Sequence, residues 1–490
     1  MDKLVLFNNI QLKKLLNKRS GESKFGEHVA MLTSITSIYD ELKNLDVTHV
    51  IIGLPEDVGV FANYGKSGAY NTWNAVIKIL INIQNNEFTR ANKVLILGYL
   101  DFTNEMLKVS NLDQSNKKDI VKARKIVKKI DKQVTYLVHQ IVLSGKKPII
   151  IGGGHNNAYG NIKGSSLAFG LPINAVNLDA HTDFRPEEGR HSGNGFSYAY
   201  AEGFLKNYFV FGVHENYTSD NLFKSFKKIK TIDFNTFEGL KIRKEVTFKK
   251  ELQRALNHVS NTPFGIEIDC DAIENIASSA MTPSGFSVNA ARTFVDFFGK
   301  HENACYLHIC EAIATADNEK QIGKLITYLI TDFIKANAVK IISYKPKYSA
   351  NFYDLNIEWL KAYFYVEPYD EEVLSNPLKH IINKGGHIFF AELDKEILGT
   401  VALMPTTEAS VFELTKMAVS PNHRGKKIGQ QLMQHCIDFS KNKNLKSIII
   451  YSSRKLENAI YIYKKYGFVE IPVEDNCPYE RCDIKMEYHL

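Results

Sequence analysis

Short runs of apolar, often β-branched residues recur along the chain, and stretches with helical spacing separate them. Eight such runs fall at 47–53, 93–98, 147–153, 173–179, 208–213, 264–271, 304–310 and 339–344. Continuous apolar strands that alternate with helices are typical of a mostly parallel sheet covered on both faces. The pattern predicts a three-layer α/β/α domain with a mostly parallel eight-stranded sheet over residues 1–345.

The pattern changes after residue 345. The segment PKYSANFYDLN is polar and rich in turn-forming residues, which is typical of a linker or a domain entry. Three strand-like runs follow it, and then a helix, a strand, a second helix and a final strand. We predict a second, smaller α/β domain over residues 346–490.

Composition restricts the picture only modestly. A chain of 490 residues is too long for one ordinary hydrophobic core. The net charge of +7 does not call for nucleic acid or an anionic membrane as a partner. The most basic run, 117–133, carries apolar residues at helical spacing and no interleaved aromatic residues, which favours a solvated helix face over a nucleic-acid surface.

The chain shows neither a signal peptide nor an apolar stretch long enough to cross a membrane. Its six cysteines form no CxxC pair, so we expect reduced, mostly buried thiols. Together these features predict a cytoplasmic protein that acts on small-molecule substrates, and we expect it to form a homo-oligomer.

Histidine and aspartate residues follow three of the predicted strands. In an extended segment, residues i, i+2 and i+4 point to the same side, so ligands with this spacing can converge on one point. Carboxylates and imidazoles together suit a pair of divalent cations such as Mn²⁺, although the ligand types alone do not select Mn²⁺ over other divalent ions. The six candidate ligands are His155, Asp179, His181, Asp183, Asp269 and Asp271.

Residues from about 45 to 345 resemble the arginase–agmatinase–formimidoylglutamase family of ureohydrolases. The segments GGGHNN, DAHTDFR and IEIDCDAIEN are similar to the family patterns GGGH-D/E, DAHxDxR and SxDxDxxDP. The resemblance implies two metal ions with shared and separate ligands: Asp179 and Asp269 on both, His155 and Asp183 on one, His181 and Asp271 on the other.

The chain departs from the family patterns at three places. Asn156 stands where an acidic residue is common, and Glu267 stands where serine is common. Glu274 and Asn275 replace the usual Asp-Pro, and the following loop, 276–285, matches the family only loosely. None of these changes removes a metal ligand, so they bear on the substrate rather than on hydrolysis.

Four further residues are candidates for contact with the substrate. The resemblance implies that His191 is a proton shuttle or substrate contact, and that Glu311 pairs with a guanidinium or formimino group. A carboxylate meets a planar N–C–N group with two hydrogen bonds, which makes this pairing natural. Arg185 and Arg190 are candidates for binding a substrate carboxylate, unless they only pair with nearby acidic residues.

Within the family, the chain resembles formimidoylglutamases most closely, through GLPEDVGVFANYG, NIQNNEF and DAHTDFRPEEGRHSG. The implied reaction converts N-formimidoyl-L-glutamate and water into glutamate and formamide, a step of histidine degradation. An arginase, an agmatinase or another guanidino-acid hydrolase is the alternative.

In the second domain, a predicted strand that ends at Val419 leads into a basic, glycine-containing loop and then a helix. Glycines let backbone N–H groups approach a phosphate closely, and a helix N-terminus adds positive potential. The loop consists of Arg424, Gly425, Lys426, Lys427, Ile428 and Gly429. We expect it to bind a phosphate group.

Together with ENAIYIYKKYGFVE, this loop resembles the GNAT acetyltransferases and their Q/RxxGxG/A motif, over about 350–490. The resemblance implies that the pyrophosphate of acetyl-CoA lies on the amides of 424–429, beside Val419. It places Asn458 near the cofactor and makes Tyr463 the acid that protonates the departing thiolate. Glu413 is a candidate general base, or else an ordinary glutamate on a strand face.

These observations predict a bifunctional enzyme with a Mn-dependent ureohydrolase domain and an acetyl-CoA-dependent N-acetyltransferase domain. In one alternative, the second domain binds acetyl-CoA without turnover and acts as a sensor. In another, the first domain is an inactive metal-dependent scaffold, but its intact set of six ligands argues against this.

Overall fold

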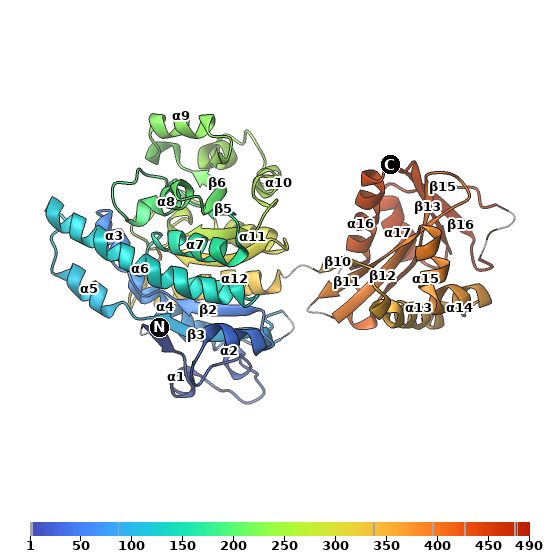
Figure 1. The fold of residues 1–490 in the computed structure, drawn as a ribbon, viewed down its shortest axis with the longest axis horizontal. Coiled ribbons are helices and arrows are strands. Elements are labelled where there is room, and N and C mark those ends of the chain that lie inside the picture. The colour runs from blue at the N-terminus through green and yellow to red at the C-terminus, as the bar shows by residue number, and fades with distance from the viewer. Residues whose placement is uncertain are drawn as a thin grey trace. The chain divides into compact units, whose positions relative to one another are not determined.

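The computed structural model describes residues 3–86, 88–336, 339–393, 396–425, 428–474, 477 and 479–490. The chain divides into two compact units, residues 1–337 and 338–490 (Figure 1). Strand β10 (Lys340–Ser343) pairs with β11 (His387–Leu393) of the second unit. The assignment of the run 339–344 to the first domain was therefore wrong. A short apolar strand does not reveal by its composition which sheet it joins.

The first unit is built on a nine-stranded sheet with the order β1-β3-β2-β4-β9-β8-β5-β6-β7. All its strands are parallel except β1, which pairs antiparallel with β3. The mostly parallel sheet is confirmed, but it has nine strands rather than the predicted eight, because β1 and β7 join it and the run 339–344 does not. The strands are β1 (Leu4–Leu6), β2 (His49–Gly53), β3 (Val94–Leu100), β4 (Lys147–Ile151), β5 (Ile173–Leu178), β6 (Leu205–Val213), β7 (Ile232–Thr236), β8 (Phe264–Asp269) and β9 (Ala304–Cys310).

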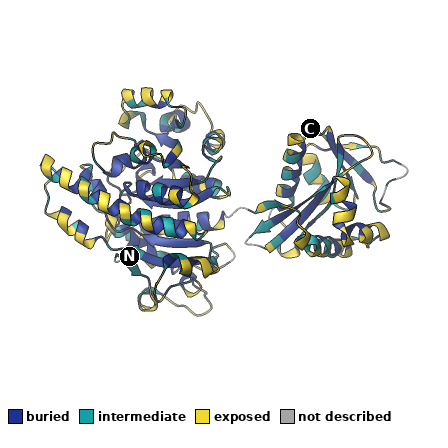
Figure 2. Cartoon of the chain, viewed as in Figure 1, coloured by how far each residue is buried: buried dark blue, intermediate teal, exposed yellow. Residues whose placement is uncertain are grey.

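Helices cover both faces of this sheet, because successive strand residues point to opposite faces and both sets are apolar. In β2, Ile51 packs in one core and Val50 and Ile52 in the other. Figure 2 shows the buried sheet between helices whose outer faces are exposed. The helices are α1 (Asn9–Leu15), α2 (Ile38–Asn44), α3 (Val58–Ala62), α4 (Thr72–Leu80), α5 (Thr103–Ser110), α6 (Lys117–Leu143), α7 (Asn157–Phe169), α8 (Gly195–Ala201), α9 (Asp220–Lys228), α10 (Phe248–Val259), α11 (Val288–Gly299) and α12 (Glu319–Lys335).

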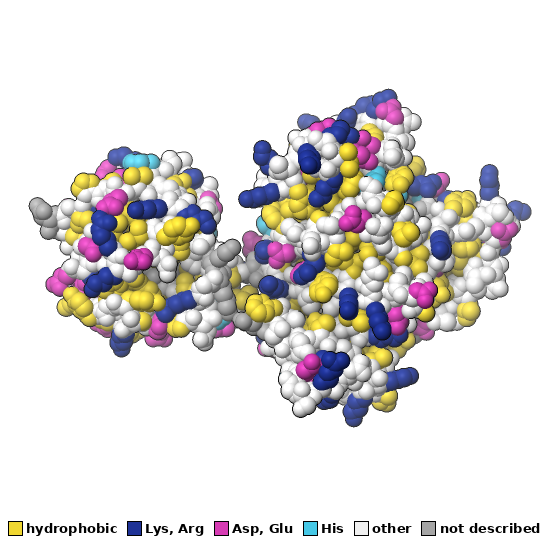
Figure 3. Space-filling view, turned by 180° about the vertical axis from the view of Figure 1, so that it is seen from behind, with side chains coloured by type: hydrophobic (Ala, Val, Ile, Leu, Met, Phe, Trp, Pro, Cys, Tyr) yellow, Lys and Arg dark blue, Asp and Glu magenta, His cyan; other side chains and the backbone are white. Residues whose placement is uncertain are grey.

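The basic run forms part of α6, where Ile120, Val127, Ile130 and Val134 are buried and the lysines are exposed, as its spacing predicted. On the face in Figure 3, Lys and Arg side chains are scattered among Asp and Glu side chains rather than gathered in one patch. Within the described ranges, no helix is both long enough and apolar enough to cross a bilayer.

The second unit is built on a seven-stranded sheet with the order β10-β11-β12-β13-β14-β16-β15. All neighbouring strands are antiparallel except β13 and β14. The remaining strands are β12 (Glu396–Pro405), β13 (Val411–Val419), β14 (Ser447–Ser452), β15 (Val469–Ile471) and β16 (Ile484–His489). The helices are α13 (Ser349–Tyr363), α14 (Pro368–Ser375), α15 (Pro377–His380), α16 (Ile428–Asn442) and α17 (Glu457–Lys465).

The parallel strands β13 and β14 separate part of the way along their length. Their pairing runs from Val411 opposite Ser447 to Glu413 opposite Ile449 and stops there, although β13 continues to Val419. The two cores of this unit lie on opposite faces of the sheet, one against α16 and the other against α13 and α14. The separation of the strands opens a gap in the sheet between these two layers.

Candidate functional site

Four adjacent strands, β4, β9, β8 and β5, end at one edge of the sheet, and three of them bring the predicted metal ligands of the first unit together. Small molecules and ions that bind to open parallel sheets do so at this edge. β4, β5 and β8 contribute from their ends or from the turns that follow, so the six residues meet although they span positions 155–271. Their positions are His155 after β4, Asp179, His181 and Asp183 after β5, and Asp269 and Asp271 at the end of β8.

The first group of side chains surrounds one ring nitrogen of His155. Its Nδ1 lies 2.8 Å from Oδ2 of Asp183, 3.1 Å from Oδ2 of Asp269 and 3.4 Å from Oδ2 of Asp179. Phe196 packs edge-on against the imidazole, with ring centroids 5.2 Å apart. The ring is therefore fixed with Nδ1 turned toward three carboxylates.

The second group centres on His181, whose Nδ1 lies 2.9 Å from Oδ2 of Asp271. Oδ1 of Asp179 lies 3.6 Å from the same nitrogen, so one carboxylate faces both groups. Asn177 donates to Oδ2 of Asp179 over 2.8 Å and holds that carboxylate in place. Tyr217, which the sequence analysis did not select, stacks on His181 with ring centroids 5.6 Å apart.

The electrostatics of these groups call for added positive charge. Burial, and then the neighbouring Asp271 and Asp179, raise the pKa of Asp269 well above its usual value. Oδ1 of Asp271 is buried and accepts no hydrogen bond from any described residue. Buried carboxylates this close together repel unless cations neutralise them. Two groups of oxygen and imidazole-nitrogen donors that share one carboxylate fit a pair of divalent cations.

Glu311 follows β9 and lies beside the ligand cluster. Its Oε1 accepts from the backbone N–H of His155 over 2.9 Å, and its Oε2 accepts from the Ser279 hydroxyl over 2.9 Å. Burial, and then the charge of Asp269, raise the pKa of Glu311 to about 8. Ser279 belongs to the loop 276–285. This divergent loop therefore contacts the carboxylate of Glu311, which is predicted to bind the substrate.

His191 is buried and uses both ring nitrogens within the protein. Nδ1 accepts from the backbone N–H of Gly193 over 3.2 Å, and Nε2 lies 3.2 Å from Oε1 of Glu188. This arrangement places the proton on Nε2. Burial, and then the charge of Arg124, lower the pKa of His191 to about 3. His191 is thus a neutral imidazole at neutral pH.

The two candidate arginines have different surroundings. Arg190 is 1% exposed, and its guanidinium donates to Asp131, Asn194 and the carbonyl oxygens of Asn156 and His191. All its N–H groups are used inside the protein, so its assignment to a substrate carboxylate was wrong. The side chain of Arg185 is 51% exposed and bonds Asn63 and Glu188, which leaves it accessible.

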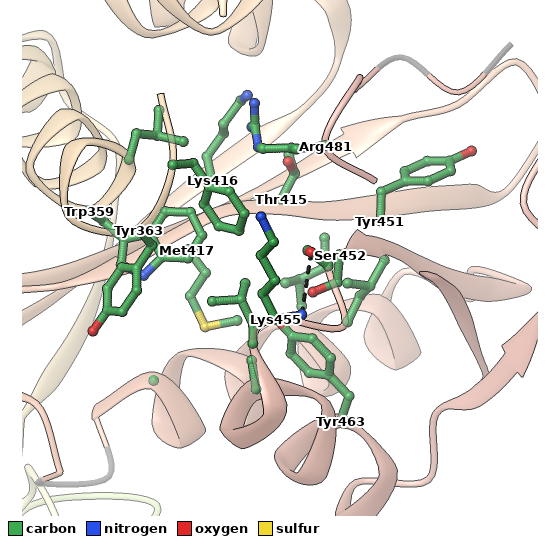
Figure 4. A pocket seen from close by; sticks show the side chains of 18 of the residues that line it. Trp359, Tyr363, Thr415, Lys416, Met417, Tyr451, Ser452, Lys455, Tyr463 and Arg481 are labelled. Carbon is green, nitrogen blue, oxygen red and sulfur yellow. Dashed lines mark hydrogen bonds between the residues drawn. The ribbon is translucent and has the colours of Figure 1, made fainter. Parts of the chain in front are cut away.

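In the second unit, a cavity of about 540 Å³ lies where β13 and β14 separate (Figure 4). Several residues predicted to bind acetyl-CoA line it, namely Val419, Arg424, Gly429, Asn458 and Tyr463. Gly425 has a φ of 79°, a conformation that favours glycine, whereas Ile428 is buried in the core. Lys426 and Lys427 lie outside the described residues.

Tyr463 projects from α17 into the cavity (Figure 4). Burial raises its pKa to about 12, so the hydroxyl keeps its proton at neutral pH. Arg424 does not extend freely into the cavity. Its Nε donates to the carbonyl oxygen of Val419 over 3.0 Å, and its guanidinium pairs with Glu358.

Glu413, the predicted general base, does not line the cavity. It is absent from the described lining, and burial raises the pKa of its carboxyl. Tyr479, which sequence reasoning missed, lines the cavity and donates from its hydroxyl to Oε1 of Glu413 over 2.9 Å. Thr415 lies 3.2 Å from the same hydroxyl. No motif marks Tyr479, because its partner is 66 residues earlier in the chain.

The far wall of the cavity carries a buried ion cluster. Nζ of Lys416 lies 2.6 Å from Asp370, and Arg481 reaches the same carboxylate over 2.7 Å. These three residues line the cavity and join β13, α14 and the segment before β16. They therefore fix the shape of its wall.

Comparison with known proteins agrees with both folds. Residues 47–335 match the arginase family, and residues 352–468 match the acetyltransferase (GNAT) family. The chain belongs to the arginase family and carries a C-terminal GNAT domain.

Formimidoylglutamases are among its relatives. Those of Streptococcus pyogenes and Streptococcus gordonii are 27% and 28% identical over 235 and 238 residues, and each match covers 46% of this chain. The chain spans 65% of the length of these relatives. Crystal structures of a variant of Trypanosoma cruzi formiminoglutamase with Mn²⁺ and of Bacillus subtilis formimidoylglutamase each match with a TM-score of 0.50 and 18% identity. Each match covers 65% of this chain, and 100% and 93% of those chains, respectively.

Proposed function

We propose that the first unit hydrolyses a C–N bond of a linear amidine, with two Mn²⁺ ions as cofactor and N-formimidoyl-L-glutamate as substrate. The observation that carries this proposal is the position of Asp179, whose two oxygens face His155 and His181. One carboxylate between two imidazole–aspartate groups is suited to hold two cations close together. The names of the streptococcal relatives support the choice of substrate.

When bound, two divalent cations lower the pKa of a water molecule and supply a nucleophile near neutral pH. The protein would hold them with His155, Asp183, Asp269, His181, Asp271 and the shared Asp179. Glu311 accepts hydrogen bonds from the N–H groups of the amidine and so orients its planar carbon. Arg185, exposed beside Glu188, pairs with a carboxylate of the substrate.

A substrate panel tests this proposal. The holoenzyme with Mn²⁺ is assayed with formimidoylglutamate, arginine, agmatine and guanidinobutyrate for release of formamide or urea. We expect formamide release from formimidoylglutamate, loss of activity in Asp179→Asn and no change in the exposed control Asp220→Asn. If only a guanidino compound is hydrolysed and urea is released, that compound is the substrate in place of formimidoylglutamate. The absence of hydrolysis with every compound would contradict the proposal.

We also propose that the second unit transfers an acetyl group from acetyl-CoA to an amine. The supporting observation is the cavity between β13 and β14, which both Tyr463 and Tyr479 line. Tyr463 can donate its proton to the departing thiolate. Tyr479, held by Glu413, is placed to accept a hydrogen bond from the attacking amine and relay its proton to the carboxylate.

The alternative role of this unit is an acetyl-CoA sensor that tunes hydrolysis. Tyr463→Phe separates the two roles. A catalytic unit loses thiol release from acetyl-CoA in the presence of an amine, whereas a sensor keeps the effect of acetyl-CoA on hydrolysis.

Hydrolysis of formimidoylglutamate releases an amine, so we propose that the second unit acetylates that product. Mass spectrometry of the products of the intact protein with acetyl-CoA tests this, and glutamate that stays unmodified would contradict it.

A further inference from the structure

Glu267 lies directly beneath the ligand cluster, on β8, at a position where the family commonly has serine. It is fully buried. Its Oε1 accepts from the Tyr306 hydroxyl over 2.6 Å, and its Oε2 accepts from Nδ1 of His308 over 2.5 Å. Both donors come from β9, the neighbouring strand, where His308 is the register partner of Glu267. Two donors therefore fix the position of this carboxylate.

The same Oε2 faces the ligand cluster. It lies 3.5 Å from Nε2 of His155, the ring nitrogen opposite the one surrounded by aspartates. That Nε2 is buried and has no hydrogen-bond partner among the residues that the structure describes. The carboxylate is thus placed where a small rotation of the imidazole completes a hydrogen bond.

The protonation of His155 follows from its surroundings. Three carboxylates converge on Nδ1, which marks it as the nitrogen that would bind a cation. A histidine binds a metal through an unprotonated nitrogen, so the proton must then reside on Nε2. A buried N–H needs an acceptor, and metal-binding histidines usually donate this second N–H to a carboxylate or carbonyl group, which fixes the tautomer and raises the basicity of the ligand.

We propose that Glu267 is a positioning residue of the metal centre: it accepts from Nε2 of His155 and so presents Nδ1 as the ligand, while Tyr306 and His308 hold Glu267 in place. A serine at this position has a shorter, uncharged side chain and offers no carboxylate to the imidazole. The inference rests on the proposed metal-dependent hydrolysis. It explains one departure from the family pattern as a support for His155 rather than as a change on the substrate side.

Calorimetric titration of the full chain with Mn²⁺ tests this inference, together with the electron paramagnetic resonance signal of a spin-coupled Mn²⁺ pair. Glu267→Gln removes the charge and keeps the volume. We expect one of the two sites to weaken about tenfold or more, the effect typical of such supporting residues, and the other to be retained. The pair signal then falls at a metal concentration that saturates the unsubstituted protein. Glu267→Ser should behave in the same way, and Tyr306→Phe should have a smaller effect.

The matched control is Glu251→Gln, since Glu251 is also buried and hydrogen bonded, to Asn235 and Arg254. Unfolding of all variants in chelator shows whether a loss of affinity is only a loss of stability. Two sites of unchanged affinity in both Glu267→Gln and Glu267→Ser would overturn the inference. Fewer than two Mn²⁺ ions bound by the unsubstituted protein would instead contradict the proposed function.

Discussion

The hydroxyl of Tyr479 donates a 2.9 Å hydrogen bond to Glu413, and of the two only Tyr479 is part of the described cavity lining. The pair can pass a proton from the cavity to a buried carboxylate. We therefore expect Tyr479→Phe and Glu413→Gln each to lower acetyl transfer by about a hundredfold or more, in the range of general-base catalysis. The double variant should lose no more than either single one, because the two residues act in series. Thiol release with an amine panel measures this. Additive losses would contradict it, and Tyr461→Phe, at an exposed tyrosine, is the control.

Glu311 is expected to act on the substrate rather than on folding. Glu311→Gln keeps one acceptor for His155 or Ser279 but removes the carboxylate that the bound cations would keep ionised and that pairs with an amidine. Hydrogen bonds to charged groups contribute about 1.5–3 kcal/mol, so kcat/KM for formamide release should fall by about ten- to a hundredfold. Ser279→Ala, which removes a neutral partner of the same carboxylate, should lose much less. An unchanged kcat/KM in Glu311→Gln would remove this residue from the proposed mechanism.

Arg190 and Arg185 should separate stability from substrate binding. Arg190→Met leaves Asp131 buried without its partner, and the free energy of unfolding of the first unit should fall by about 3–5 kcal/mol. Arg185→Ala should change it by less than about 0.5 kcal/mol, as is usual at the surface, and raise KM instead. Urea unfolding and steady-state kinetics of both variants measure these effects. The reverse assignment would follow if Arg190→Met raised KM without loss of stability.

Glu56 should make the stability of the first unit depend on pH. It is buried and accepts from the side chains of Asn156 and Asn157 and from the backbone N–H of Val58, and burial raises its pKa to about 7. Since its folded pKa lies above the unfolded value of 4.5, its contribution is complete below pH 4.5 and is lost as the pH rises through 7. At 1.36 kcal/mol per pKa unit, the loss amounts to about 3 kcal/mol.

Urea unfolding of the unsubstituted protein and of Glu56→Gln at pH 4.5 to 8 checks this dependence. A glutamine has one side-chain oxygen, so it cannot accept both from the two asparagine side chains and from the backbone N–H of Val58. The variant therefore has a constant loss of stability at every pH. The informative quantity is therefore the slope, which should flatten in Glu56→Gln over this interval. Parallel curves for the two proteins would contradict the assignment.

Removal of metal should destabilise the first unit alone. A ligand that binds only the folded state adds about 2.7 kcal/mol at a concentration one hundred times its Kd. Chelation should therefore lower the unfolding temperature of the first unit by several degrees, and Mn²⁺ should restore it. The transition of the second unit, followed by its response to acetyl-CoA, should not move. Equal unfolding temperatures with and without chelator would argue against a bound cation.

The strand ends and the family resemblance together predicted the ligand cluster. The alternation expected for Asp179, His181 and Asp183 is not realised, because β5 ends at Leu178 and Asp183 has a φ of 44°, so the three side chains meet through the turn that follows the strand. Other outcomes depend on partners that are remote in sequence. Arg190 pairs with Asp131, 59 residues earlier, which no local pattern reveals. In the same way, the apolar run 339–344 predicts a strand but does not show that this strand pairs with β11.

The backbone of Glu311 has a φ of 61°, a conformation that is unfavourable for a side chain with a Cβ atom by on the order of 1–3 kcal/mol. A glycine there would relieve this strain, but it would remove the carboxylate and leave the backbone N–H of His155 without its acceptor. Alanine would lose the same acceptor and keep the strain, so it should destabilise the first unit more than glycine does.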